Sequence, residues 1–212
     1  MSLVDTISNH KIIAVIRHAE EATILPILSA LNEGGVKAVE ITAETPQVAK
    51  LIEKAALEFK GEMLIGAGTV LDPETARTVL LAGAQFIVSP TVNPETIKLT
   101  NRYGILNISG ALTPTEILTA YESGTDMVKV FPADVFGPGY IKNLQGPLGH
   151  IPVVVTGGVT IDNMNDFIRN GSKAVGIGSN LVNPARLKTE ADYEELKNIA
   201  AAYRKKVNEL SS

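Results

Sequence analysis

The chain has 212 residues, of which 45% are hydrophobic and 20% charged, and its formal net charge is −4 at pH 7. This composition excludes a disordered chain and predicts one folded domain over residues 1–212 with a continuous core. The slight negative charge gives no general attraction for nucleic acid or an anionic membrane, so we expect neither as a partner. The lack of cysteine excludes disulfides, thiolate metal sites and cysteine nucleophiles.

Residues 1–10 contain two ionisable groups and no apolar h-region, so they do not look like a signal peptide. The apolar runs are far shorter than the roughly 20 residues that cross a bilayer. We therefore expect a cytoplasmic protein that acts on a small molecule.

Short β-branched runs recur along the chain, and each is followed by a cluster of Gly, Thr, Ser or Pro and then by a helix-patterned segment. The predicted strands are residues 12–17, 36–42, 63–69, 85–89, 105–109, 127–131, 153–156 and 174–177. Their even spacing predicts eight strand–helix units.

Several helices are marked by an N-cap type of residue, often with proline at the first helical position. These starts are Thr45-Pro46, Asp72-Pro73, Asn93-Pro94, Thr113-Pro114, and Thr160 or Asp162. The helices they predict are residues 47–59, 74–81, 95–102, 115–122 and 163–169, with a closing helix over residues 192–210. C-cap glycines predict helix ends at Gly34-Gly35, Gly83, Gly104, Gly124 and Gly171.

Strands that alternate with helices imply parallel pairing, so the fold class is α/β. Eight units in a chain of this length favour a single-domain (β/α)8 TIM barrel. The alternative is a doubly wound open sheet, but its nucleotide-binding signature is missing. Gly66-Ala67-Gly68 follows a strand, yet neither the third glycine nor the ribose-binding acid is in place.

Lys129 is the single charge in the apolar strand Met-Val-Lys-Val-Phe-Pro. An ammonium group in such a place loses hydration, so its pKa falls and the free amine needed for a Schiff base becomes accessible. A lysine at an exposed strand end or in a buried ion pair would give the same local pattern. Phe131-Pro132 follows directly, however, which puts Lys129 near the catalytic end of its strand.

Glu40 is likewise the single charge in Ala-Val-Glu-Ile-Thr. If Glu40 and Thr42 face the barrel lumen, alternation turns Val39 and Ile41 toward the helices. A lumenal carboxyl near an imine can shuttle protons as a general acid and base. The alternative, that Glu40 only neutralises Lys129, is compatible with this role.

Other polar groups close the predicted strands. Arg17 ends the first strand, where its guanidinium suits a substrate carboxylate, although the pattern fits a surface arginine equally. Thr69, Ser89-Pro90 and Gly110 end the next strands and suit a substrate-lined mouth, although turn formation explains them as well.

Two glycine clusters follow the last two predicted strands. Thr156-Gly157-Gly158-Val159 leads toward a helix, and Gly176-Ile177-Gly178-Ser179 leads into a predicted helical turn. Glycines allow backbone N–H groups to approach an anion, and many TIM barrels bind phosphate at these two loops. Together the clusters predict a phosphate site.

The three histidines, His10, His18 and His150, do not form a spaced metal set. This disfavours a metal-dependent epimerase or aldolase, and we expect no metal at the site.

With these residues assembled, the chain resembles the aldolases of 2-keto-3-deoxy-6-phosphogluconate (KDPG) and 4-hydroxy-2-oxoglutarate (KHG) over residues 13–182. The matching segments are Gly34-Gly35-Val36, Val39-Glu40-Ile41-Thr42, residues 65–70, residues 83–90, Gly110, Thr113-Pro114-Thr115-Glu116, residues 129–133, Thr156-Gly157-Gly158-Val159 and Gly176-Ile177-Gly178-Ser179. Several such blocks in one order are specific to a family.

The resemblance implies a class I aldolase that splits KDPG into pyruvate and glyceraldehyde 3-phosphate, needs no cofactor and forms a homotrimer. By position it implies Lys129 as the imine lysine and Glu40 as the general acid–base. It also implies substrate contacts at Thr69, Pro90, Phe131 and Thr156, and a phosphate site at Gly157, Gly158, Gly178 and Ser179.

Two departures from the family pattern concern the substrate. Glu44 stands where some members have the arginine that binds the pyruvate carboxylate, so Arg17 is the substitute candidate. Ser109 stands where many members have proline, and we expect both departures to border the substrate mouth. The galactonate epimer, KHG (which yields pyruvate and glyoxylate) and another 2-keto-3-deoxy acid are therefore alternative substrates. A phosphate-ligand-binding barrel without catalysis is the alternative of another class.

Overall fold

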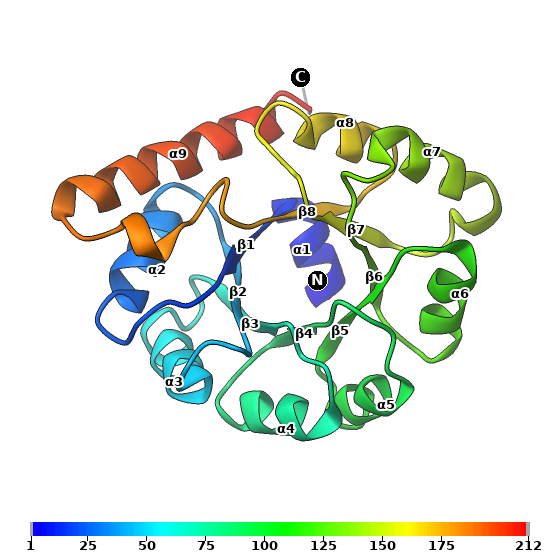
Figure 1. Ribbon diagram of the computed structural model, residues 1–212, viewed down its shortest axis with the longest axis horizontal. Coiled ribbons are helices and arrows are strands. Elements are labelled where there is room, and N and C mark those ends of the chain that lie inside the picture. The colour runs from blue at the N-terminus through cyan, green and yellow to red at the C-terminus, as the bar shows by residue number, and fades with distance from the viewer. Residues whose placement is uncertain (1, 211–212) are drawn as a thin grey trace.

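The computed structural model describes residues 2–210, in which eight parallel strands form a closed barrel in the order β1 to β8 (Figure 1). The strands are β1 (Ile12–Ile16), β2 (Ala38–Thr42), β3 (Leu64–Gly68), β4 (Phe86–Val88), β5 (Leu106–Ala111), β6 (Met127–Val130), β7 (Val153–Thr156) and β8 (Ala174–Ile177). The predicted (β/α)8 barrel is confirmed, and every strand boundary lies within two residues of its prediction.

Helices surround the barrel. They are α1 (Leu3–His10), α2 (Ile24–Glu33), α3 (Val48–Glu58), α4 (Pro73–Leu81), α5 (Pro94–Arg102), α6 (Pro114–Glu122), α7 (Gly137–Leu148), α8 (Met164–Arg169) and α9 (Glu190–Asn208), with a 3₁₀ turn η1 (Pro184–Arg186). None of the helices within residues 2–210 is long and apolar enough to cross a membrane.

Two of these helices are absent from the sequence-based prediction, and one is predicted only through its end. Helix α1 lies within residues 1–10, where the sequence predicts no element, and α7 contains several glycines and prolines that disfavour helix. The sequence predicts only the end of α2, at Gly34-Gly35. In the structure Thr23 precedes α2 but makes no side-chain capping bond.

Side-chain caps fix the start of several helices as predicted. Asp72, Asn93 and Thr113 accept hydrogen bonds from backbone N–H groups in the first turns of α4, α5 and α6, and proline follows each of them. The five helix ends predicted at glycine are also confirmed, because Gly35, Gly83, Gly104, Gly124 and Gly171 all have positive φ.

One predicted cap, at Thr45, is wrong. The Thr45 hydroxyl accepts a hydrogen bond of 3.1 Å from the backbone N–H of His18, so it is engaged with the neighbouring β1–α2 loop and α3 begins only after Gln47. The predicted cap at Thr160 is confirmed for the turn that leads into α8, because its hydroxyl accepts from the backbone N–H of Asn163 while Oδ1 of Asn163 accepts from the backbone N–H of Thr160. Helix α8 itself begins after Asn163.

The core consists of two apolar layers. Val39 and Ile41 belong to the outer layer between strands and helices, whereas Ala38 belongs to the lumen, which confirms the predicted alternation along β2. The lumen is filled by side chains such as Phe86, and Ile7 of α1 packs onto it, so α1 closes one end of the barrel (Figure 1). The functional groups lie toward the other end, where the strands finish.

Candidate functional site

Lys129 on β6 and Glu40 on β2 lie on strands that face each other across the ring of eight. Alternation turns both side chains into the lumen, one step beyond the lumenal residues Met127 and Ala38. Each is only 2% exposed. The structure therefore brings together an amine and a carboxyl in a dry space, as the two isolated charges in apolar strands predict.

Burial governs the ionisation of both groups. Loss of hydration lowers the pKa of Lys129, against the opposing charge of Glu40. Loss of hydration also raises the pKa of Glu40, against the opposing charge of Lys129. Within residues 2–210 no ion pair of 4.0 Å or less joins them, and Oε1 of Glu40 is buried without a hydrogen-bond partner. Burial thus acts on the pair in the direction of a free amine facing a protonated carboxyl.

Phe131 forms one wall beside the amine. Its ring centroid lies 4.9 Å from Nζ of Lys129, a distance at which the ring stabilises the ammonium form and so partly opposes burial. The peptide bond between Phe131 and Pro132 is cis.

Glycines make room for two of the candidate residues, the side chain of Glu40 and the backbone of Pro90. A Cβ at Gly68 would lie 2.6 Å from Oε1 of Glu40, and a Cβ at Gly110 would lie 2.2 Å from the backbone carbonyl carbon of Pro90. Gly110 is also the register partner of Lys129. The sequence-based analysis missed this role of Gly68, although a glycine inside a strand is a known sign of close approach.

The side chain of Thr156 also occupies space that a neighbouring glycine leaves free. It ends β7 in register with Gly176 of β8, and a Cβ at Gly176 would lie 2.3 Å from Oγ1 of Thr156. The hydroxyl therefore sits over the backbone of the neighbouring strand at the mouth of the barrel.

The phosphate candidates lie in the loops after these two strands. Gly157 and Gly158 have φ values of 96° and 66°, which other residues rarely adopt. The carbonyl of Gly178 accepts hydrogen bonds from the backbone N–H groups of Leu181 and Val182, which forms the predicted helical turn. Ser179, within this turn, is exposed to solvent. Asp134 packs against Gly158, so an acid borders this loop.

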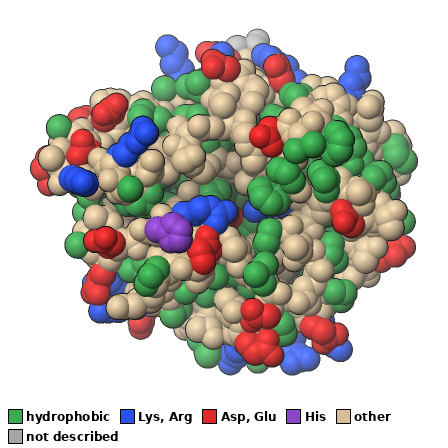
Figure 2. Space-filling view, viewed as in Figure 1, with side chains coloured by type: hydrophobic (Ala, Val, Ile, Leu, Met, Phe, Trp, Pro, Cys, Tyr) green, Lys and Arg blue, Asp and Glu red, His purple; other side chains and the backbone are tan. Residues whose placement is uncertain are grey.

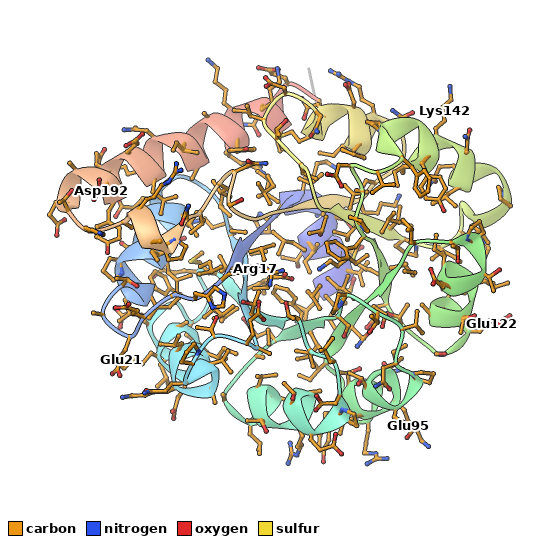
Figure 3. All side chains as sticks on the ribbon, in the orientation of Figure 1. Arg17, Glu21, Glu95, Glu122, Lys142 and Asp192 are labelled. Atoms are coloured by element: carbon orange, nitrogen blue, oxygen red, sulfur yellow. The ribbon has the colours of Figure 1, made fainter. Side chains whose placement is uncertain are left out.

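Arg17 lies at the centre of the ring of strands in Figure 3, whereas the other labelled charges lie on the periphery. Its Nη1 forms an ion pair with Glu44 and donates a hydrogen bond of 3.2 Å to Oγ1 of Thr69. Thr69 has a φ of 55°, an unusual value for a β-branched residue and one often found at functional sites. The positive charge of Arg17 adds to the effect of burial in lowering the pKa of Lys129, and it opposes the effect of burial in raising the pKa of Glu40.

A cleft of about 700 Å³ opens beside Arg17. It is lined by the β1–α2 loop, including His18, and by the segment after β8, including Ser179, Lys188 and Tyr193. Figure 2 shows basic, acidic and histidine side chains meeting beside a hollow near the centre of this face. The cleft thus connects the Arg17 side of the mouth with one of the phosphate candidates.

The expectation that Ser109 borders the mouth is wrong. Its register partner is Val128, which belongs to the outer apolar layer, so Ser109 points away from the lumen. Its hydroxyl donates to Oδ1 of Asn107 at 2.6 Å, and its backbone N–H donates to Oγ1 of Thr125 at 3.2 Å. A proline at this position would lose that N–H donor, so the departure from the family pattern is a packing feature.

No group of three or more His, Asp or Glu side chains in residues 2–210 is placed to hold a metal ion. His18 lines the cleft, whereas His150 packs edge-on against Tyr121 with ring centroids 5.3 Å apart.

Comparison with known proteins identifies the family. The KDPG and KHG aldolase family matches residues 3–199. The chain is 35% identical to 2-dehydro-3-deoxy-6-phosphogalactonate aldolase of Escherichia coli, over 92% of this chain and 96% of that one. It is 36% identical to 2-dehydro-3-deoxy-phosphogluconate aldolase of Pseudomonas aeruginosa, over 78% and 76% of the two chains.

A solved KDPG aldolase from Legionella pneumophila, with pyruvate captured as a covalent carbinolamine intermediate, superposes with a TM-score of 0.88 at 27% identity over 96% of this chain and 98% of that one. The family match spans most of the chain, and the fold agrees with it. The chain therefore belongs to the KDPG and KHG aldolase family and is a carbon–carbon lyase.

Proposed function

We propose that this aldolase works through a Schiff base on Lys129, with Glu40 as the general acid and base, and that its substrate is KDPG. One observation carries the proposal: two facing side chains, each 2% exposed, have pKa values moved by burial toward a free amine and a protonated acid. A free amine is the nucleophile that imine formation requires, and a protonated acid is the partner that removes water.

In the first stage Nζ of Lys129 attacks the C2 carbonyl carbon of the substrate to form a carbinolamine. Glu40 donates its proton to the departing hydroxyl, so water leaves and a protonated imine forms. Glu40 is then a carboxylate, ready to act as a base.

In the second stage Glu40 removes the proton of the C4 hydroxyl. The C3–C4 bond breaks, its electron pair moves into the imine to give an enamine, and C4 leaves as the aldehyde of glyceraldehyde 3-phosphate. Glu40 returns its proton to C3 and is again a carboxylate. Water then hydrolyses the resulting protonated imine, which releases pyruvate and the free Lys129 amine, and the proton set free returns to Glu40.

The remaining candidates hold the substrate in this proposal. Arg17 binds the carboxylate at C1, in the place of the family arginine that Glu44 replaces. Thr69 and Pro90 line the pyruvate end, and Phe131 walls the lumen beside the imine.

The other end of the substrate lies toward β7 and β8. Thr156 contacts the sugar-acid hydroxyls, while the backbone of the two glycine loops binds the phosphate. The phosphate residues are Gly157, Gly158, Gly178 and Ser179. The positive φ values of the first two glycines and the cleft that reaches Ser179 support this assignment.

Borohydride reduction in the presence of pyruvate tests the mechanism. We expect a mass increase confined to the peptide that carries Lys129, and none in Lys129→Ala, whose fold should be intact. Phosphate-ligand binding without any pyruvate adduct would instead favour a barrel without catalysis.

A second substrate is supported by the relative from E. coli, which acts on the galactonate epimer. Pyruvate release should therefore be compared at equal concentrations of KDPG, its galactonate epimer and KHG. We expect the highest kcat/KM for KDPG, and a preference for the epimer would reassign the substrate while leaving the Lys129 chemistry in place.

We also propose a homotrimer, which the family resemblance supports. Val135 and Phe136, at the start of the segment leading into α7, are 61% and 57% exposed, and such apolar side chains suit a contact between copies. Figure 2 shows hydrophobic side chains gathered on this side of the mouth. Light scattering on the purified protein gives the number of copies. The cytoplasmic location stays a prediction.

A further inference from the structure

The guanidinium of Arg17 is held from one side. Among residues 2–210, both of its hydrogen bonds leave from Nη1, one to Glu44 and one to Thr69. Nε and Nη2 make none of the hydrogen bonds found there. Two adjacent N–H groups on the free edge of a guanidinium match the two oxygens of a carboxylate.

Glu44 is itself held in place. Burial raises the pKa of its carboxyl, but a bond to its own backbone N–H, the charge of Arg17 and a hydrogen bond with Thr42 outweigh burial and lower the pKa. Glu44 is therefore an anion at neutral pH and stays paired with Arg17. The contacts run from Glu44 through Arg17 to Thr69, across the ends of three neighbouring strands.

We infer that Glu44 is a positioning residue for the substrate carboxylate: it fixes Arg17 through Nη1, so that Nε and Nη2 are preorganised to bind the C1 carboxylate of the 2-keto acid. This inference rests on the proposed function, since it concerns the same substrate. It explains how an acid can stand where some relatives have an arginine. The arginine comes from β1, and the acid from β2 orients it.

The geometry distinguishes a positioning role of Glu44 from competition with the substrate carboxylate for Arg17. A carboxylate that competed with substrate would occupy the forked edge of the guanidinium, whereas Glu44 engages the nitrogen that also bonds Thr69. Glu44 also offsets the charge of Arg17 at the reactive pair, because the two charges act in opposite directions on both Lys129 and Glu40. Arg17 can thus attract a carboxylate with little disturbance of the imine chemistry.

The test measures the pyruvate concentration that gives half-maximal borohydride trapping on Lys129. Pyruvamide, a ketone without the carboxylate, is trapped in parallel. For Glu44→Ala we expect the value for pyruvate to rise roughly three- to tenfold, the usual cost of ordering one long side chain on binding, and the value for pyruvamide to change much less, because it feels only the altered charge near Lys129. Glu44→Gln should show a smaller rise, because its amide oxygen still accepts from Nη1.

Glu33→Ala is the matched control. Glu33 forms an ion pair with Lys197 at 3.1 Å, on the outer surface between α2 and α9, and its loss should leave both values unchanged. Should Glu44→Ala be too unstable to assay, the difference between pyruvate and pyruvamide in Glu44→Gln carries the test.

Three results would overturn the inference: an unchanged value for pyruvate, a lower value, which would make Glu44 a competitor of substrate, or an equal rise for both ketones, which would indicate general damage. Failure of the unsubstituted protein to trap pyruvate at all would overturn the proposed function itself. Trapping that Glu44→Ala does not alter would leave that function standing.

Discussion

Gly68→Ala is the substitution that tests the position of Glu40 most directly. The added Cβ would lie 2.6 Å from Oε1, 2.8 Å from Cδ and 3.2 Å from Cγ of Glu40. Carbon and oxygen atoms that are not bonded rest about 3.5 Å apart, so the carboxyl must move by about 1 Å. Gly68 has no positive φ, and alanine can therefore adopt its backbone conformation.

A misplacement of that size costs up to about 100-fold in rate, so we expect kcat for pyruvate release to fall roughly 10- to 100-fold. The amine of Lys129 is untouched, and borohydride should still trap pyruvate on it at equilibrium. Overpacking of the lumen should lower the free energy of unfolding by about 1–3 kcal/mol. A pyruvate-release assay and urea denaturation measure the two effects.

Gly139→Ala is the matched control, because no atom lies within 4 Å of its added Cβ in α7. It should leave kcat unchanged and should not destabilise the protein. A kcat for Gly68→Ala within about threefold of the unsubstituted enzyme, less than about 0.7 kcal/mol in activation free energy, would refute the assignment of Glu40 as the group whose position limits the reaction.

Three further predictions follow from the same packing. Burial raises the pKa of Glu40 above its ordinary 4.5, so its contribution to stability is fully present below about pH 4.5 and is lost as the pH rises through the raised value. Glu40→Gln should therefore gain stability relative to the unsubstituted protein in urea titrations as the pH rises from about 4.5 toward the raised pKa, and a constant difference would contradict this. Lys129→Met should abolish pyruvate release without lowering the melting temperature, because it replaces a buried amine by an apolar side chain of similar length; residual release would show that another amine reacts. Ser109→Ala should cost about 1–2 kcal/mol of stability through its lost bond to Asn107 while leaving kcat/KM unchanged, and a changed kcat/KM would return Ser109 to the substrate mouth.

The buried pair of Lys129 and Glu40 could be predicted from the sequence because each residue is a lone charge in an apolar strand. Alternation along a strand has a period of two, so a charge within a buried run must face either the lumen or the helix layer. The closed ring then sets Lys129 of β6 opposite Glu40 of β2. Neither step needs a long-range contact to be known in advance.

The mouth could not be predicted in the same way, because its contacts join different strands. The pairing of Arg17 with Glu44, and the bond of Thr45 to the backbone of His18, both link segments 27 residues apart. Local propensity makes Thr45 a helix cap, and a tertiary contact overrides it. The orientation of Ser109 depends likewise on the exact register of β5, because a shift of one residue would turn its side chain to the opposite face of the strand.

The glycines of the lumen show why the site lies at one end of the barrel. An eight-stranded barrel has an interior just wide enough for its own side chains, so space for a substrate exists only where side chains are removed. At the closed end the ring of Phe86 fills the space left by Gly66, above the apolar contact with α1. One layer further, Gly68 leaves room for the carboxyl of Glu40, and Gly110 leaves room for the backbone of Ser89 and Pro90. The same apolar floor that blocks the barrel keeps water from beneath the two ionisable groups, and for that reason burial lowers the pKa of Lys129 and raises the pKa of Glu40 against their mutual attraction.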